Sequence, residues 1–294
     1  MKSKEPVFSE HILLKDFCTY AIGGPARYFL EIRTIEDMQA AIAFCCSHNI
    51  HYFVLGKGSN TLFDDRGYNG CILLNKIDFF EQPTSGTFHV GAGYSFSLLG
   101  VQSARQGWSG LEFASGIPGS VGGAVYMNAG ANGHETCEHL ELVDFVNEEG
   151  YLEIIPKQEL SFTYRHSLFQ KRKGAIVGAT FLLEADALAR KKQIDIVNYR
   201  IKTQPYGDKS AGCVFVNPDC GHAGALIEQY GLKGFSIGGA AVSTLHANFL
   251  INNNGASCQD MLDLIHHIQV KIKEEAGLNL ETEVRYIPYS PGHI

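Results

Sequence analysis

The chain lacks several features that mark large classes of proteins. No run of about 18 apolar residues occurs, so we expect no membrane-spanning helix. The formal net charge is −7 and no basic block occurs, which argues against a nucleic-acid partner. The polar start Met1–Pro6 does not resemble the beginning of a secretory signal, which predicts a cytoplasmic protein. With 294 residues, 45% of them apolar, and no low-complexity linker, we expect two or three closely associated domains.

The common cysteine and histidine motifs are also missing. Eight cysteines are scattered without a Cys-x-x-Cys pair, which suits neither a zinc site nor a disulfide framework and predicts reduced thiols. His134 and His139 lie beside Glu135 and Glu138, but the histidines are five residues apart instead of four. They would not share one helix face as a His-Glu-x-x-His site requires. We therefore predict no metal.

The familiar nucleotide-binding motifs are absent as well. Neither Gly56-x-Gly58 nor Gly91-x-Gly93 has a glycine three residues further on, and no Walker-type Gly-Lys-Ser/Thr occurs. These absences disfavour a doubly wound nicotinamide-binding fold.

Glycine, in contrast, is concentrated in one stretch, residues 110–133. Small or apolar residues separate these glycines, whereas a flexible linker would be polar. Glycine permits positive φ and close approach of the backbone to a ligand, and consecutive N–H groups can form an anion cradle. The alternative is a tightly packed core turn. The glycines are at positions 110, 116, 119, 122, 123, 130 and 133.

A second glycine cluster follows a predicted strand. Residues 50–55 are rich in β-branched and aromatic side chains and lead directly into Gly56-Lys-Gly-Ser-Asn60. Such a turn offers main-chain donors, one cation and two short polar side chains at one point. This chemistry suits a pyrophosphate, although glycine turns at strand ends are common.

Helix signals are clear at several places. Thr34 with Asp37, and Ser257 with Asp260, are typical N-terminal caps. The second cap begins a long helix with an apolar stripe, which Gly277 ends. That stripe comprises Met261, Leu264, Ile265, Ile268 and Ile272. We expect two further helices, over 95–105 and over 187–203, and the second would carry Ile194, Val197 and Ile201 on one stripe. Extended segments are expected over 71–80, 87–93 and 280–287, and mostly antiparallel strands over 140–184.

Three segments together resemble one family, the UDP-N-acetylenolpyruvoylglucosamine reductases (MurB), in its shorter subclass without the tyrosine loop. They are Leu55-Gly-Lys-Gly-Ser-Asn60, the run from Gly110 to Gly130 around Ser115-Gly-Ile-Pro-Gly-Ser120, and Tyr164-Arg-His-Ser167. Supporting matches bring the resemblance to residues 15–287, in a specific order and spacing. They are Gly212–Pro218, Gly231–Gly234, Ile237–Ser243 and Glu283–Arg285.

The resemblance implies an α+β architecture, the FAD-binding fold of the vanillyl-alcohol-oxidase type with two α+β FAD-binding subdomains and a separate α+β substrate-binding domain. The expected boundaries are 1–75, completed by 279–294, then 76–187 and 188–278. Such enzymes pass a hydride from NADPH through FAD to the enolpyruvyl group of UDP-N-acetylglucosamine-enolpyruvate, giving UDP-N-acetylmuramate for peptidoglycan. We expect a monomer with non-covalent FAD.

The family's catalytic positions fall on Arg165, Cys213 and Glu283. The resemblance implies that Arg165 polarises the substrate carboxylate and that Glu283 stabilises or shares a proton with the intermediate. Most relatives have serine where Cys213 stands; a thiol, with a pKa of about 8.5, donates a proton more readily, so we hypothesise that Cys213 is the acid. From pattern alone the three residues are also consistent with a surface arginine, a small buried residue and a solvated strand face.

The resemblance also assigns binding residues. Tyr164, Asn217, Lys233 and His246 would bind the substrate, although Asn217 and Lys233 could equally be ordinary turn residues. Asn132 stands where relatives place a phosphate-contacting tyrosine, and Thr203 stands near a substrate-binding lysine, with Lys202 as a possible substitute. The cofactor residues would be Gly56, Lys57, Gly58, Ser59, Asn60, Ser115, Gly116, Pro118, Gly119, Ser120, Gly122, Gly123 and Ala124.

Two other functions stay open from the sequence. One is a different FAD-dependent oxidoreductase of the same fold, which would often tether its flavin; no His or Cys adjoins Gly56–Asn60. The other is a UDP-sugar binding protein that has lost catalysis, suggested by the serine-to-cysteine change. The presence of Arg165 and Glu283 argues against it.

Overall fold

The computed structural model describes residues 6–290. Their contacts divide the chain into two compact units. Within the described residues, unit 1 comprises residues 6–9, Tyr28–Lys57 and Gly70–Arg200, and unit 2 comprises Glu10–Arg27, Gly58–Asn69 and residues 201–290. The three-part division expected from the sequence stays a prediction.

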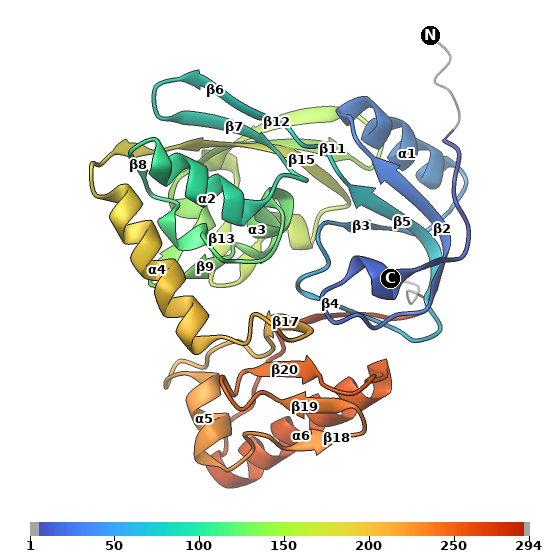
Figure 1. Ribbon diagram of the computed structural model, residues 1–294. Coiled ribbons are helices and arrows are strands. Elements are labelled where there is room, and N and C mark those ends of the chain that lie inside the picture. Colours follow the sequence, from blue (N-terminus) through green and yellow to red (C-terminus); the bar gives the residue numbers. More distant parts are fainter. Residues whose placement is uncertain (1–5, 291–294) are drawn as a thin grey trace. The chain divides into compact units, whose positions relative to one another are not determined.

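Unit 1 is built on a five-stranded antiparallel sheet in the order β12-β11-β15-β7-β6. It confirms the antiparallel strands expected over 140–184. Helices α2 (Phe96–Arg105) and α3 (Val121–Met127) pack on this sheet through a buried cluster that includes Phe96, Val125 and Phe181 (Figure 1). The strands are β6 (Phe80–Thr84), β7 (Thr87–Gly91), β11 (Leu140–Asn147), β12 (Leu152–Pro156) and β15 (Gly174–Leu182).

A second cluster in unit 1 holds the strand that leads to the glycine turn. Helix α1 (Ile35–Ser47) begins as predicted, because the Thr34 hydroxyl accepts a 3.1 Å hydrogen bond from the Asp37 N–H. Its buried face packs with β5 (Tyr68–Asn75), which runs parallel to β3 (Tyr52–Leu55). Strand β3 therefore ends, firmly anchored, just before Gly56.

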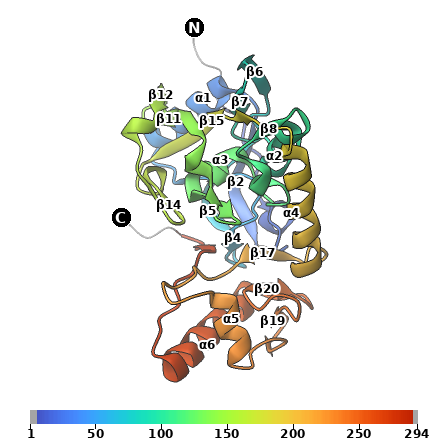
Figure 2. The ribbon, with the colours of Figure 1, turned by 90° about the vertical axis from the view of Figure 1, so that its left-hand side faces the viewer.

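Helix α4 (Ala189–Thr203) does not bury the expected stripe. Ile194 is 41% exposed and Ile201 is 60% exposed, whereas Gln193 and Arg200 are buried. The Arg200 guanidinium donates a 3.2 Å hydrogen bond to the Gly116 carbonyl, which explains why a polar side chain occupies the inner face. The helix lies beside α2 in both views (Figures 1 and 2).

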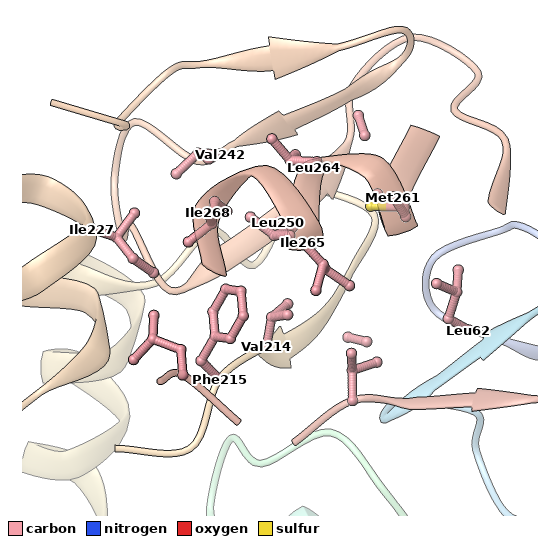
Figure 3. Packing of buried hydrophobic residues seen from close by; sticks show 14 of the residues in the cluster. Leu62, Val214, Phe215, Ile227, Val242, Leu250, Met261, Leu264, Ile265 and Ile268 are labelled. Atoms are coloured by element: carbon pink, nitrogen blue, oxygen red, sulfur yellow. The ribbon is translucent and has the colours of Figure 1, made fainter. Parts of the chain in front are cut away.

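Unit 2 contains a four-stranded antiparallel sheet in the order β17-β20-β19-β18, covered by α5 (Ala223–Gln229) and α6 (Cys258–Ala276). Helix α6 has the predicted capping box, and all five residues of its predicted stripe are buried. Val214 and Phe215 belong to the same core, with side chains directed toward Ile265 and Ile268 (Figure 3). The strands are β17 (Ser210–Cys213), β18 (Ser236–Ile237), β19 (Ala240–Val242) and β20 (Phe249–Asn252).

A parallel strand pair in unit 2 brings the end of the chain beside an early segment. Strand β21 (Arg285–Ile287) pairs with β4 (Thr61–Phe63). Beside the pair, the Asp64 carboxylate accepts hydrogen bonds from the Arg66 guanidinium at 2.7 Å and from the Tyr286 hydroxyl at 2.8 Å. The remaining strands and 3-10 helices are short, apart from β2 (Pro25–Ile32).

Across residues 6–290, none of the helices combines the length and the apolar character that crossing a bilayer requires.

Candidate active site

The two glycine-rich segments meet in unit 1. A Cβ atom on Gly56 would lie 2.4 Å from the Ser120 hydroxyl oxygen, closer than real Cβ contacts. The turn after β3 therefore touches the start of α3, and a Cβ at position 56 would displace the Ser120 hydroxyl. The sequence predicted ligand-binding roles for both segments, and the structure places them side by side.

The main-chain donors at the start of α3 already have partners within the protein. The N–H groups of Val121 and Gly122 donate to the carbonyls of Tyr94 and Ala92, each at 2.9 Å. The Gly123 N–H donates to the Ser120 hydroxyl at 3.3 Å. These glycines consequently permit close packing and offer no amide cradle.

The turn after β3 is better suited to an anion. Among residues 6–290, no main-chain oxygen accepts a hydrogen bond from the N–H of Lys57 or Gly58. Burial lowers the pKa of the Lys57 ammonium, and the neighbouring charge of Lys76 lowers it further. Two cations and unpaired amides together favour a bound negative charge. These residues fit the pyrophosphate of FAD.

Ser115 gives a second indication of a ligand. Its side chain is fully buried, and its hydroxyl has no hydrogen-bond partner among the described residues. Burying a hydroxyl without a partner is costly. Next to it, the Gly116 N–H donates to the Ser97 hydroxyl at 2.7 Å, which holds the loop. The Ser115 hydroxyl is therefore available to a cofactor beside this loop.

Arg165 occupies a strained hairpin turn in unit 1. Tyr164 and Arg165 form the two-residue loop between β13 (Phe162–Thr163) and β14 (His166–Ser167), and Arg165 has a φ of 62°. A left-handed conformation is uncommon outside glycine and clusters at functional sites. The guanidinium donates to the Gly130 carbonyl at 3.1 Å and lies 4.6 Å from the centre of the Tyr164 ring. This connects Arg165 to the end of the glycine-rich run.

Cys213 ends β17 in unit 2, directly after a local irregularity. Ser210 pairs with Ile251, but the register shifts before Cys213 pairs with Phe249. Gly212 has a φ of 77° at this shift. Bulges of this kind redirect side chains and are frequent next to active sites. The thiol is half-buried.

Glu283 lies beside the same segment. Its N–H donates a 2.7 Å hydrogen bond to the carbonyl of Val214, the residue after Cys213. Its own carbonyl accepts a 3.0 Å hydrogen bond from the Asn60 side-chain amide. Glu283 is half-buried, although strand alternation alone indicates a solvated face. Two predicted catalytic positions are thus adjacent in the main chain of unit 2, whereas Arg165 belongs to unit 1.

The predicted substrate residues have partners of their own. The side-chain amide oxygen of Asn217 accepts a 3.0 Å hydrogen bond from the N–H of Ala223, the first residue of α5, and the Lys233 ammonium pairs with Glu228 at 2.9 Å. These are the turn-type contacts that the sequence left open. Burial lowers the pKa of His246. Tyr164 is exposed and lies against Arg165.

Asn132, one of the departures from the family pattern, has a local structural reason. Asn132 and Gly133 form the tight turn between β9 (Gly130–Ala131) and β10 (His134–Glu135), with φ angles of 57° and 82°. Asn-Gly is the preferred pair for such a turn, and a tyrosine would be strained there.

Sequence reasoning missed three residues near these sites: Lys76, Arg200 and Asn248. Lys76 and Arg200 carry no local signal, since a charged residue at a strand end or on a helix is usually solvated. Asn248 carries no local signal either, because asparagine is common where a strand such as the apolar run from Phe249 begins.

Comparisons with known proteins decide the family. The model of the C-terminal domain of UDP-N-acetylenolpyruvoylglucosamine reductase matches residues 204–287, and that of an FAD-binding domain matches residues 26–155. The reductase of Protochlamydia amoebophila (strain UWE25) is 61% identical over 96% of this chain and 94% of its own. The chain belongs to the UDP-N-acetylenolpyruvoylglucosamine reductase family. The crystal structure of MurB from Thermus caldophilus has a TM-score of 0.83 and 35% identity, covering 96% of this chain and all of that one.

Membership of the MurB family confirms the main sequence predictions. The fold is the α+β FAD-binding type, and the protein is an FAD- and NADPH-dependent reductase of UDP-N-acetylglucosamine-enolpyruvate in peptidoglycan synthesis. The reductase of Chlamydia muridarum (strain MoPn / Nigg), 46% identical over 96% of this chain and 95% of its own, supports the same assignment.

Proposed function

We propose that Cys213, Glu283 and Arg165 carry the chemistry of this MurB reductase, with Cys213 as the proton donor. The observation that supports this most directly is the hydrogen bond from the Glu283 N–H to the carbonyl next to Cys213. It places the main chain of Glu283 beside Val214, the residue that follows Cys213. When bound, FAD supplies the hydride that reduces the enolpyruvyl double bond.

The reaction requires both an acid and a cation. Hydride addition to an enol ether beside a carboxylate spreads negative charge onto that carboxylate, and the neighbouring carbon must then gain a proton. The planar guanidinium of Arg165 suits the carboxylate, and its hydrogen bond to the Gly130 carbonyl helps to orient it. The Cys213 thiol donates its proton to the carbon. The Glu283 carboxylate stabilises the intermediate.

For the cofactor, we propose two contact regions within the predicted set. The turn Gly56–Asn60 binds the pyrophosphate, supported by the amides of Lys57 and Gly58 and the positive charge of Lys57 and Lys76. The loop Ser115–Ala124 lies along the flavin, supported by the buried hydroxyl of Ser115. Asn60 has a further role, since its side-chain amide bonds the Glu283 carbonyl.

For the substrate, we propose contacts from Tyr164, Asn217, Lys233 and His246, with Lys202 replacing the lysine absent at Thr203. Asn217 and Lys233 would exchange their present partners for the nucleotide phosphates. We also infer that the chain acts as a cytoplasmic monomer. Sedimentation and cell fractionation test these two points.

A two-step anaerobic titration tests the function. NADPH should bleach the yellow protein, and UDP-N-acetylglucosamine-enolpyruvate should then restore the colour in stoichiometric amount. Acid precipitation should release the flavin, because no covalent tether is expected. A colourless protein that takes up no FAD, or a bleached protein that the nucleotide does not recolour, would contradict the proposal.

A further inference from the structure

Asn248 has a buried side-chain amide that forms two hydrogen bonds with Phe215. It is 2% exposed and immediately precedes β20. Its side-chain oxygen accepts a 2.9 Å hydrogen bond from the Phe215 N–H, and its side-chain nitrogen donates a 2.9 Å hydrogen bond to the Phe215 carbonyl. The side chain therefore pairs with both main-chain groups of Phe215, as a neighbouring strand would.

The two side-chain bonds of Asn248 lie just beyond the end of the pairing between β17 and β20. The last ladder pair between β17 and β20 is Cys213 with Phe249. One residue further, the Val214 N–H donates to the main-chain carbonyl of Asn248 at 2.8 Å, and Asn248 then holds Phe215. Asn248 thus holds Val214 and Phe215, the two residues that follow Cys213, although they lie beyond the paired part of β17.

The opposite edge of the same segment is held by the main chain of residues 281–283. The Glu283 N–H donates to the Val214 carbonyl at 2.7 Å, and the Val216 N–H donates to the Glu281 carbonyl at 2.9 Å. Phe215 is also bridged to Thr282. The segment 214–216 therefore lies between Asn248 on one side and the main chain of Glu283 on the other. Its position determines where Cys213 and Glu283 lie relative to each other.

We propose that Asn248 is a positioning residue for proton transfer in this reductase. Its two hydrogen bonds to Phe215 keep the segment after Cys213 at a fixed distance from the main chain of Glu283, so that the thiol is presented in one orientation. The proposal rests on the proposed roles of Cys213 and Glu283. It concerns the oxidative half-reaction alone, since reduction of the flavin by NADPH needs no proton from Cys213.

Asn252, the last residue of β20, provides a matched control. Its side-chain nitrogen donates to the Tyr20 carbonyl at 2.9 Å, and its side-chain oxygen accepts from the Ala256 N–H at 2.8 Å. It therefore makes the same number of hydrogen bonds to the main chain, but to segments other than 213–216. Asn252→Ala should lower the melting temperature as Asn248→Ala does, without affecting proton transfer.

The test compares half-reactions in rapid-mixing experiments on the flavin-loaded enzyme. For Asn248→Ala we expect reduction by NADPH within about twofold of the unmodified enzyme and reoxidation by UDP-N-acetylglucosamine-enolpyruvate about a hundredfold slower. KM for the nucleotide should be unchanged. Asn248→Asp, which keeps the acceptor and loses the donor, should slow reoxidation about tenfold. If Asn248→Ala does not retain flavin, Asn248→Asp is used for the test in its place.

Two further readouts separate positioning from general destabilisation. The solvent deuterium isotope effect on reoxidation should rise in Asn248→Ala. The rate at which iodoacetamide alkylates Cys213, measured on the peptide that contains this residue, should also change. Neither should change in Asn252→Ala. Reoxidation at the unmodified rate in both Asn248 variants would overturn the positioning role if Cys213→Ala is inactive. Full activity of Cys213→Ala would instead overturn the proposed function on which this role rests.

Discussion

The N–H of Glu283 donates a 2.7 Å hydrogen bond to the carbonyl of Val214, the residue that follows Cys213. This bond joins two segments that are far apart in the sequence and carry two of the three catalytic candidates. A main-chain bond is less easily lost to substitution than a side-chain contact, because any residue except proline supplies the same N–H. The structure therefore predicts that side-chain variants at either position alter chemistry more than architecture.

Substitution of Gly56 tests the contact between the two glycine segments. An alanine Cβ would lie 2.4 Å from the Ser120 hydroxyl, which must then abandon its cap on the Gly123 N–H. Overpacking of this kind costs about 1–3 kcal/mol. We expect Gly56→Ala to weaken FAD binding about tenfold or more, measured by flavin fluorescence titration.

Two controls accompany this variant. Ser120→Ala in the Gly56→Ala background removes the clashing oxygen and should restore the affinity to that of Ser120→Ala alone. Gly207→Ala adds a Cβ with no atom within 4 Å and should bind FAD normally. If Gly56→Ala binds FAD as tightly as the unmodified protein, the proposed approach of this turn to the cofactor is wrong.

Arg165→Lys keeps the charge but removes the planar fork. Lysine cannot pair with a carboxylate through two parallel N–H groups, and removal of one well-placed donor to developing charge typically costs about 10²–10³ in rate. We expect reoxidation of the reduced enzyme to slow by that factor, with reduction by NADPH unaffected. Arg172→Lys, which alters an arginine paired with Glu153 in the same unit, should leave both half-reactions unchanged. If Arg165→Lys and Arg172→Lys are reoxidised at equal rates, Arg165 does not take part in the reaction.

The ionised Asp64 carboxylate is expected to contribute to the free energy of unfolding in a way that is lost in acid. The Arg66 guanidinium beside Asp64 holds the pKa of that carboxyl well below its usual range, and the Tyr286 hydroxyl lowers it further. Because the folded state favours the ionised form, this stabilisation is present above about pH 4, where an unfolded Asp is ionised, and is lost as the pH falls below that value.

Asp64→Asn should therefore lower the free energy of unfolding at pH 7 by about 1–3 kcal/mol. It should also flatten the loss of stability below about pH 4, as measured by urea unfolding across the pH range. Asp263→Asn, an exposed α6 carboxylate that pairs with Gln259, is the control and should change stability by less than about 0.5 kcal/mol. An unchanged acid profile in Asp64→Asn would contradict this account.

Local signals predicted much of the fold. The caps at Thr34 and Ser257 and the buried stripe of α6 follow from hydrogen-bonding and periodicity rules, and the structure confirms them. Helix α4 shows the limit of periodicity. Its inner face holds Arg200 because a carbonyl of the glycine-rich loop needs a donor there, which no spacing within the helix reveals.

The candidate site was predicted from motif order, not from local physics. Alternation indicated a solvated Glu283, but a main-chain bond to Val214 and the Asn60 amide hold that segment against the protein. Asn248 was missed for a similar reason, since its function depends on Phe215, which only the fold brings close. The sequence alone does not predict which distant segments the fold brings into contact.

The rate at which UDP-N-acetylglucosamine-enolpyruvate reoxidises the NADPH-reduced enzyme, compared between Cys213→Ala and Cys213→Ser, tests the central claim most directly. If Cys213 donates the proton, the alanine variant should still be bleached by NADPH at a normal rate but should not recolour, and the serine variant should retain part of the activity. Recolouring of the alanine variant at the unmodified rate would show that another group supplies the proton.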